Sequence, residues 1–311
     1  MKPGHEKIER RTTAEGERVR QAEPSSRQTG AIPVWQSSTI EWPGFRSQYA
    51  LIGPHEGATE TGPLQIGMSF ASHRKLVQRH DGKEREIDVA PGAAFVTAGS
   101  PVTWHRVREV TEALEIYPQP ELLAYAAGLA SSRIAIRPAL GVPDPVVVAI
   151  ATQLRRAHLG GIAIGHIAAS ELGLRLVEHL LFHYSEVRVA LDRVSGMLDR
   201  RRLLRVADFI EAGLSEPLDI PVLAAVAGLS PFHFSRAFRK ATGMSPHAYV
   251  AARRLSRARL LALGSNLTVD AIAASVGYSN ISHFRRIFKA EFGATPAAIR
   301  ASPDPALLSA A

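Results

Sequence analysis

The chain has 311 residues, more than a single hydrophobic core usually holds, so we expect two domains. It contains no cysteine, which excludes disulfides, cysteine-ligated zinc and a cysteine nucleophile. The net charge is +8, and residues 229–300 carry 11 Lys or Arg against two acids, a local balance of +9. A basic balance confined to one segment indicates a polyanionic partner.

The sequence gives no sign of a membrane or export segment. No apolar run reaches the roughly 18 residues that a membrane-spanning helix needs. The first residues are charged rather than signal-like. We therefore expect a cytoplasmic protein without a membrane partner.

The N-terminal half has the pattern of a mainly-β domain. Residues 1–30 are polar, without hydrophobic periodicity, and are expected to form a disordered tail. Short β-prone runs then alternate with turn signals, among which Asp81-Gly82 predicts a hairpin and Pro91-Gly92 another turn. We expect a small antiparallel sheet or barrel within residues 31–130. The clearest runs cover residues 64–70, 74–79, 93–97, 102–107 and 113–117.

Helical patterns follow this domain. We predict helices at residues 121–130, 146–159 and 170–184, with a Pro/Gly connection at 136–145 and a linker region spanning 131–198. In the third helix Leu172, Leu176 and Leu180 recur every four residues and form an apolar stripe. Such a stripe packs on the chain's own β-domain or on another subunit, and we assign it as a candidate homodimer face.

The C-terminal region, residues 199–301 before a tail at 302–311, contains the same segment twice, 50 residues apart. One copy reads HFSRAFR from His233 and the other HFRRIFK from His283, each followed by a Gly and a Pro. A short Ala-rich run ending in a Gly precedes each copy. A short helix, a Gly turn and a helix with one aromatic and one basic face predict a helix-turn-helix. Two such units point to DNA.

Both copies predict the same two helix faces. The buried set is Phe234, Ala237, Phe238 and Ala241 in the first copy and Phe284, Ile287, Phe288 and Phe292 in the second. The outward sets suit DNA because Arg bonds guanine, Ser bonds bases or phosphate, and Phe contacts a thymine methyl. Positions one turn further on favour phosphate, while a solvated charge stays the alternative for any single Arg. The outward sets are Phe232, Ser235, Arg236 and Arg239, with Lys240, and Ser282, Arg285, Arg286 and Lys289.

A long helix is predicted between the two units, from Pro246 to about Leu263. Its 18 or so residues give roughly 27 Å at 1.5 Å per residue. A strut of that length suits two recognition helices placed in major-groove segments about 34 Å apart. Four arginines on it, at positions 253, 254, 257 and 259, are expected to face phosphate or solvent.

The repeated region resembles the AraC/XylS family of bacterial transcription regulators. The segments GLSPFHFSRAF from Gly228 and GYSNISHFRRIFK from Gly277 carry the resemblance, together with TGMSP from Thr242 and FGATP from Phe292. It covers roughly residues 200–300 and implies an all-α domain with two helix-turn-helix units. The DNA-binding residues we assign are Phe232, His233, Ser235, Arg236, Arg239, Lys240, Ile281, Ser282, His283, Arg285, Arg286 and Lys289.

The resemblance also implies a cupin-like sensor barrel in the N-terminal half, where residues 91–101 are similar to a cupin strand motif. Metal-binding cupins need a His pair with a Glu and a later His. No His-x-His occurs, and Val102 stands where the later His is expected. His73, His80 and His105 are more often surface or core histidines than ligands. We therefore expect no metal, no cofactor and no enzymatic activity.

The interpretation is a transcription regulator that binds double-stranded promoter DNA. Its further partners are a small-molecule effector, a second copy of the chain and, if it activates, RNA polymerase. Two alternatives stay open. A cupin enzyme with an appended DNA-binding domain would show bound metal or turnover, and a constitutive promoter or nucleoid binder would occupy DNA without ligand.

Overall fold

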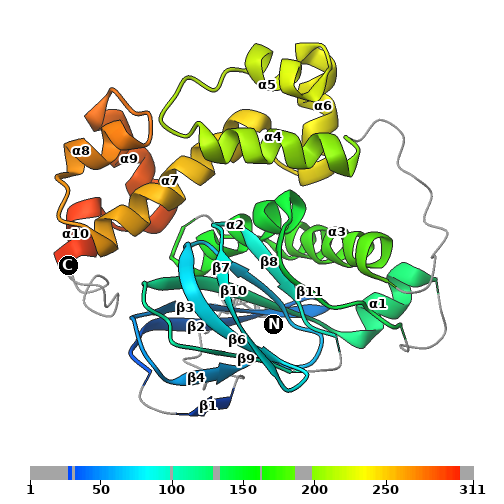
Figure 1. Cartoon of the computed structure of the whole chain (residues 1–311). Coiled ribbons are helices and arrows are strands. Elements are labelled where there is room, and N and C mark those ends of the chain that lie inside the picture. The colour runs from blue at the N-terminus through cyan, green and yellow to red at the C-terminus, as the bar shows by residue number, and fades with distance from the viewer. Residues whose placement is uncertain are drawn as a thin grey trace, which may run out of the picture.

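A computed structural model describes residues 27–29, 32–98, 101–128, 134–161, 163–185 and 198–301. A mainly-β N-terminal region lies beside a helical C-terminal region, which confirms the predicted fold class (Figure 1). The expected tails at 1–26 and 302–311, and part of the cupin-like motif at 99–100, lie outside the described residues. The tail expected up to residue 30 is wrong at β1 (Arg27–Thr29), because this segment pairs with β4 (Ala58–Glu60).

Two antiparallel sheets make up the N-terminal region. The five-stranded sheet has the order β1-β4-β9-β6-β7 and the six-stranded sheet the order β11-β8-β5-β10-β3-β2. The first contains β9 (Val102–His105), β6 (His73–His80) and β7 (Lys83–Val89). The second contains β11 (Ala139–Pro143), β8 (Ala93–Val96), β5 (Ile66–Ser69), β10 (Thr111–Pro118), β3 (Phe45–Ile52) and β2 (Val34–Trp42).

The turns between strands follow from residues that tolerate a left-handed backbone. Asp81 has φ 48° and Gly82 φ 72°, and two positive angles in a two-residue loop match the predicted hairpin between β6 and β7. Gly92, with φ 83°, makes the turn predicted before β8. The expected connection at 136–145 instead contains β11, which pairs with β8.

Helices cover the six-stranded sheet: α1 (Pro120–Ala127), α2 (Pro145–His158) and α3 (His166–Tyr184). Asp144 caps α2 by accepting hydrogen bonds from the amides of Val146 and Val147, each 3.1 Å. The leucine stripe of α3 is buried within the chain, with Leu172 8%, Leu176 1% and Leu180 0% exposed. The homodimer face assigned to this stripe is therefore wrong, because its apolar surface packs into the intramolecular core.

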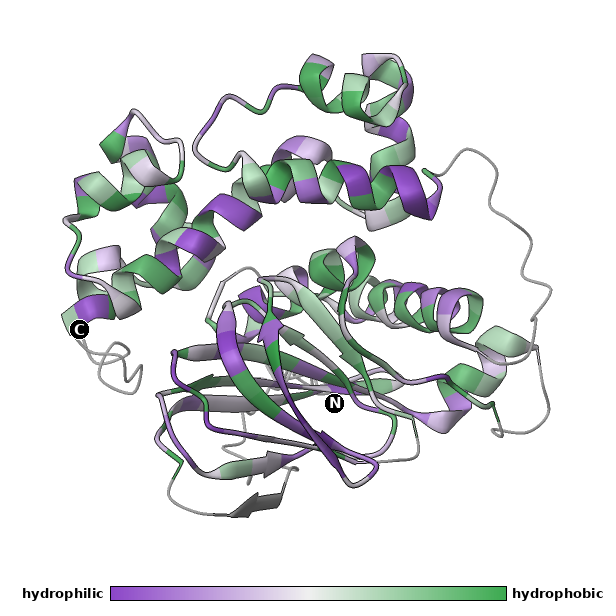
Figure 2. Cartoon of the chain, viewed as in Figure 1, coloured by the Kyte–Doolittle hydropathy of each residue, from purple (hydrophilic) through white to green (hydrophobic). Residues whose placement is uncertain are grey.

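The C-terminal region is all-α. The long helix predicted between the units is α7, and it runs from one unit to the other (Figure 1). Hydrophilic and hydrophobic segments alternate along α7 (Figure 2). No helix among the described residues is long and apolar enough to cross a membrane. The helices are α4 (Arg200–Ala212), α5 (Ile220–Ala227), α6 (Pro231–Thr242), α7 (Pro246–Gly264), α8 (Val269–Ser275), α9 (Ile281–Phe292) and α10 (Pro296–Ala301).

The buried apolar residues do not divide where the sequence suggested. One cluster joins the six-stranded sheet, α2 and α3 to the helices α4, α5 and α6 and to the N-terminal half of α7. The helices α8, α9 and α10 surround a second cluster with the C-terminal half of α7. The predicted linker helices thus belong to the core of the N-terminal region, and that core continues into the first helix-turn-helix unit.

Candidate nucleic-acid interface

The first helix-turn-helix unit consists of α5 and α6. Helix α5 ends at Gly228, whose φ of 64° is a left-handed conformation that glycine adopts without strain. Its amide satisfies carbonyls of the last turn. Ser230 then caps α6 by accepting from the amide of His233 at 3.4 Å, and Pro231 occupies the first turn. The sequence Gly-Leu-Ser-Pro therefore builds the turn and starts the recognition helix.

The second unit repeats this construction with α8 and α9. Thr268 caps α8 through the amide of Ala271 at 3.1 Å. Gly277, with φ 77°, makes the turn, and Asn280 caps α9 through the amide of His283 at 2.9 Å. Both recognition helices therefore begin at a side-chain cap that follows the glycine turn predicted from the repeat.

The aromatic face of each recognition helix is buried. Phe234 and Phe238 of α6 are each 0% exposed, and so are Phe284 and Phe288 of α9. Rings of each pair lie in contact, with centroids 5.5 Å apart in the first unit and 5.6 Å in the second. The burial fixes the rotation of each helix and leaves its opposite face outward.

The outward residues of α6 are accessible as predicted. Phe232 is 72% exposed, and its ring centroid lies 5.8 Å from that of His233. Arg236, Arg239 and Lys240 are exposed and Ser235 is half-buried. The His233 ring lies 2.9 Å from the Ser230 hydroxyl, so this histidine also orders the start of the helix.

On α9 the outward residues form a small polar network. Arg286 approaches Nδ1 of His283 at 3.2 Å, and Arg285 forms an exposed ion pair of 3.2 Å with Asp270 on α8. Ser282 and Lys289 are exposed, whereas Ile281 is half-buried. An exposed ion pair contributes little to stability. A phosphate of a polyanion would therefore readily replace the Asp270 carboxylate as the partner of Arg285.

The strut arginines do not behave as predicted. Arg253 and Arg259 are 2% and 4% exposed and pair with carboxylates, so they face neither phosphate nor solvent. Arg254 donates to the backbone carbonyls of Leu214 at 2.9 Å and Glu216 at 2.6 Å. Of the four, Arg257 is left exposed. The exposed positive charge among these residues therefore lies mainly on the two recognition helices, with Arg257 as the exposed arginine of the long helix between them.

The C-terminal end of each recognition helix touches the N-terminal region. Gly243, after α6, lies directly against the Arg175 side chain of α3. Gly293, at the matching place after α9, is so close to α2 that an added Cβ would lie 2.7 Å from the Leu159 carbonyl oxygen. The N-terminal region thus holds both helices by their C-terminal ends, which leaves their N-terminal halves, the part that reads base edges in such motifs, accessible.

A second site lies between the two sheets, as a cavity of about 340 Å³. Its wall is mostly apolar, with Met68, Phe95 and Trp104 among the lining residues. His55 bonds the Gly53 carbonyl through Nδ1 at 2.9 Å, so Nδ1 carries a proton, and its buried Nε2 has no hydrogen-bond partner among the described residues. An apolar cavity with a few polar groups is typical of a small-molecule site.

Burial shifts the pKa of two groups on the cavity wall, His73 and Glu115. Burial and the nearby His55 lower the pKa of His73 to about 4, so this histidine is neutral at pH 7. Burial raises the pKa of Glu115, and the hydroxyl of Tyr117, 2.6 Å from its carboxylate, opposes that shift. His73, His80 and His105 have different carboxylate neighbours, Glu109, Asp81 and Glu84 respectively, and the described residues contain no group of three or more such side chains that could hold a metal ion.

Comparison with known proteins concerns the C-terminal region. Residues 223–302 match the family model described as a helix-turn-helix domain. The Right origin-binding protein of Escherichia coli K12 is 38% identical over 97 residues, covering 31% of this chain and 33% of that protein. The transcriptional regulator GlxA of Rhizobium meliloti is 37% identical over 98 residues, covering 32% and 30%.

A solved AraC-type regulator structure from Chromobacterium violaceum is 30% identical, covers 32% of this chain and 90% of that one, and has a TM-score of 0.31. The chain spans about a third of the length of the curated relatives it matches, with 33% of PocR from Salmonella typhimurium as a further case. Residues 223–302 thus match a helix-turn-helix domain in the region where the motifs resemble AraC/XylS regulators.

Proposed function

We propose that this protein is a transcription regulator that reads two segments of one promoter site, one with α6 and one with α9. The observation that carries the proposal is the agreement of two outward faces across a 50-residue repeat. Each face presents an exposed arginine at the same place, Arg236 on α6 and Arg286 on α9, next to serine and histidine side chains. Solubility alone requires no such repetition.

The residues divide into two roles. Arg236 and Arg286 lie within the first half of their helices, where side chains reach base edges, and are assigned to bidentate guanine contacts. Phe232, at 72% exposure, is assigned to a thymine methyl. Arg239 and Lys289 lie a turn further on, and we assign them to phosphate. Ile281 is half-buried and contributes apolar contact.

The test is selection of binding sites from random DNA with the wild-type protein, Arg236→Ala and Arg286→Ala. We expect each variant to lose preference in a different segment, about 10 base pairs apart. Each loss should be about 1–3 kcal/mol at the affected bases. Arg85→Ala, at an exposed position on β7, is the matched control and should select the wild-type site.

Two outcomes would reject this division of roles. If both variants relax the same bases, the two units do not read separate segments. If neither changes base preference but both lower the salt dependence of binding by about one unit of slope, the two arginines contact phosphate only.

Two macromolecular partners also belong to the proposal. RNA polymerase is the further partner if the protein activates, and a homodimer, if formed, uses a surface other than the leucine stripe.

The cavity supports a sensing role for the N-terminal region. We propose a largely apolar effector that carries at least one hydroxyl or amine donor to satisfy Nε2 of His55. A compound panel should raise the melting temperature of the wild type and not of a cavity-filled Ala113→Leu variant. DNA occupancy that no such compound changes would favour a constitutive binder.

A further inference from the structure

The central strands of the six-stranded sheet carry the cavity on one face and a buried polar cluster on the other. On β10, Thr111, Ala113 and Glu115 line the cavity, and Glu112 between them faces the helices. On β3, Gln48 and Ala50 line the cavity while Tyr49 turns to Glu112. Because side chains alternate along a strand, the cavity and the cluster share one wall.

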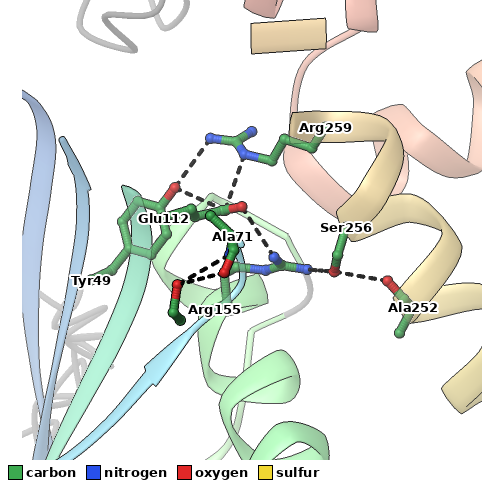
Figure 3. Close-up of polar contacts among 8 residues, drawn as sticks. Tyr49, Ala71, Glu112, Arg155, Ala252, Ser256 and Arg259 are labelled. Atoms are coloured by element: carbon green, nitrogen blue, oxygen red, sulfur yellow. Dashed lines mark hydrogen bonds and ion pairs between the residues drawn. The ribbon is translucent and has the colours of Figure 1, made fainter. Parts of the chain in front are cut away.

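Glu112 is the centre of this cluster. Its carboxylate accepts from the Tyr49 hydroxyl at 3.0 Å and from Nη1 of Arg155, on α2, at 3.4 Å. Its Oε1 also lies 3.1 Å from Nε of Arg259, on α7. Arg259 donates to the Tyr49 hydroxyl at 3.2 Å, and Arg155 to the Ser256 hydroxyl of α7 at 2.8 Å. The sheet, α2 and α7 are thus tied through one carboxylate (Figure 3).

The aromatic rings around Arg155 extend the cluster to α9. The Arg155 guanidinium lies 3.8 Å from the ring centroid of Phe70, directly after β5, and 5.0 Å from that of Phe292 at the end of α9. Arg259 lies 5.0 Å from the same Phe292 ring. A guanidinium over a ring face is favourable, and more so when both are removed from water. The cluster therefore contacts the second helix-turn-helix unit directly.

The charges of the cluster are withdrawn from water. Glu112 and Arg155 are 0% exposed and Arg259 is 4% exposed. The two guanidiniums both form ion pairs with the single carboxylate of Glu112. Buried charges tolerate no loss of a partner, because the remaining charge is neither solvated nor neutralised.

The second unit has few other attachments to the N-terminal region. Its own buried cluster is separate from the one that joins the first unit to the sheet. Outside the Glu112 cluster, the described residues also join the second unit to the N-terminal region through the Arg156–Glu291 ion pair of 2.7 Å and through Leu159, which packs against both apolar clusters and lies close to Gly293. The Glu112 cluster is therefore the main buried ionic link between the sheet and the strut that leads to the second unit.

We propose that Tyr49, Glu112, Arg155 and Arg259 form an interdomain clasp that holds the second helix-turn-helix unit in the orientation needed for two-segment DNA binding, and through which the cavity controls that unit. The regulatory part rests on the function proposed above. The clasped state presents the outward residues of both recognition helices, so it is the binding-competent state. Release of the clasp frees the second unit, and DNA binding must then restrict it again.

Arg259→Met is the first test, because it leaves Glu112 with Arg155 as a balanced pair and removes the ionic link to α7, while the hydrogen bond from Arg155 to Ser256 of α7 remains. Arg257→Met removes the same charge from an exposed position on the same helix and is the control. The cysteine-free chain allows label pairs at Arg85→Cys with Ala290→Cys on α9, and Arg85→Cys with Ala225→Cys on α5. We expect Arg259→Met to broaden the distance distribution of the α9 pair and not of the α5 pair.

The second test links the cavity to the clasp through DNA affinity. Arg259→Met should weaken binding to the two-segment site roughly tenfold, beyond any loss in Arg257→Met, because an unrestrained unit must be ordered on binding. Ala113→Leu, which fills the cavity from the strand that carries Glu112, should change the affinity in the wild type. In the Arg259→Met background that change should disappear, whereas it should persist beside Arg257→Met.

The outcomes separate the two proposals. Unchanged label distances in Arg259→Met would overturn the clasp even if DNA binds as proposed. Additive effects of Ala113→Leu and Arg259→Met would overturn the control of the clasp by the cavity. If Arg259→Met fails to fold by circular dichroism, Tyr49→Phe removes one hydroxyl and leaves every charge paired, and the same distances decide. No DNA binding by the wild type would reject the proposed function, while the label distances would still test the clasp.

Discussion

The two helix-turn-helix units have the same local construction and different attachments. Phe234 and Phe238 of the first unit belong to the apolar cluster that also contains the six-stranded sheet, α2 and α3. Phe284 and Phe288 of the second belong to a separate cluster, and that unit meets the N-terminal region through the apolar side chain of Leu159 and through polar contacts such as Glu291 with Arg156.

Because the two units are attached differently to the N-terminal region, we expect them to move differently. Apolar burial is non-directional and proportional to area, so the first unit moves with the N-terminal region as one body. Buried ionic contacts depend on geometry and on every partner being present. The second unit is therefore the one whose position can respond to the cavity, and the first is the reference against which it moves.

Truncating one buried phenylalanine in each unit gives the largest expected effect. Phe238→Ala and Phe288→Ala should each lower the free energy of unfolding of their cluster by about 3–5 kcal/mol. Hydrogen exchange should show lost protection across α4 to α6 and the six-stranded sheet in Phe238→Ala, because they share a core. In Phe288→Ala the loss should stay within α7 to α10. An identical exchange pattern in the two variants would contradict the difference in attachment.

Acid should weaken the shared core through His158 of α2. This histidine lies 2.7 Å from the Ser38 hydroxyl and 2.8 Å from that of Ser47, and burial lowers its pKa from 6.5 to about 3. The folded protein holds His158 neutral, so the stability is complete above pH 6.5 and is lost as pH falls toward 3. The loss attributable to His158 should approach about 1.4 kcal/mol per pH unit in that window.

Denaturant unfolding measured across this pH window checks the assignment. His158→Asn keeps a hydrogen-bonding side chain that does not titrate, so its stability should depend less on pH than that of the wild type. Equal pH dependence in the two proteins would show that His158 is not the group responsible.

The two glycines after the recognition helices offer a smaller, matched comparison. Gly243 has φ 79° and Gly293 φ 73°, so alanine should cost each about 1 kcal/mol of backbone strain. At Gly243 the neighbour is the flexible end of Arg175, which can move. At Gly293 it is the Leu159 backbone carbonyl, which cannot, so Gly293→Ala should also displace the second unit from α2. Thermal unfolding that ranks Gly243→Ala as the more damaging variant would be evidence against this contact.

The helix-turn-helix units were predictable because local signals specify them. These signals are the N-caps Ser230 and Asn280, the glycine turns and the phenylalanine spacing. Each depends only on residues close by in the sequence, and each occurs in both copies of the repeat. The Asp81-Gly82 hairpin is local in the same way. The placement of all these elements required no knowledge of distant contacts.

The clasp and the leucine stripe were not predictable in this way. Arg259 meets Glu112 and Arg155 only after the sheet and two helices have assembled, and along the sequence it resembles any other arginine of the strut. The stripe at Leu176 was consistent with both an intramolecular and an intersubunit partner. The contacts of the tertiary structure decided between them. That residues 199–301 form a domain of their own stays a prediction. In the structure the first unit shares its buried core with the sheet.

The most direct measurement of the central claim varies the spacing of the DNA site. Once a two-segment site has been selected, full-length protein is titrated onto versions with about 5 or about 10 base pairs inserted between the segments, half a helical turn and a full turn. With the second unit held by the clasp, we expect the half-turn insertion to weaken binding by more than tenfold and Arg259→Met to reduce that penalty. Equal affinity for all spacings in the wild-type protein would contradict two units held in a fixed relative orientation.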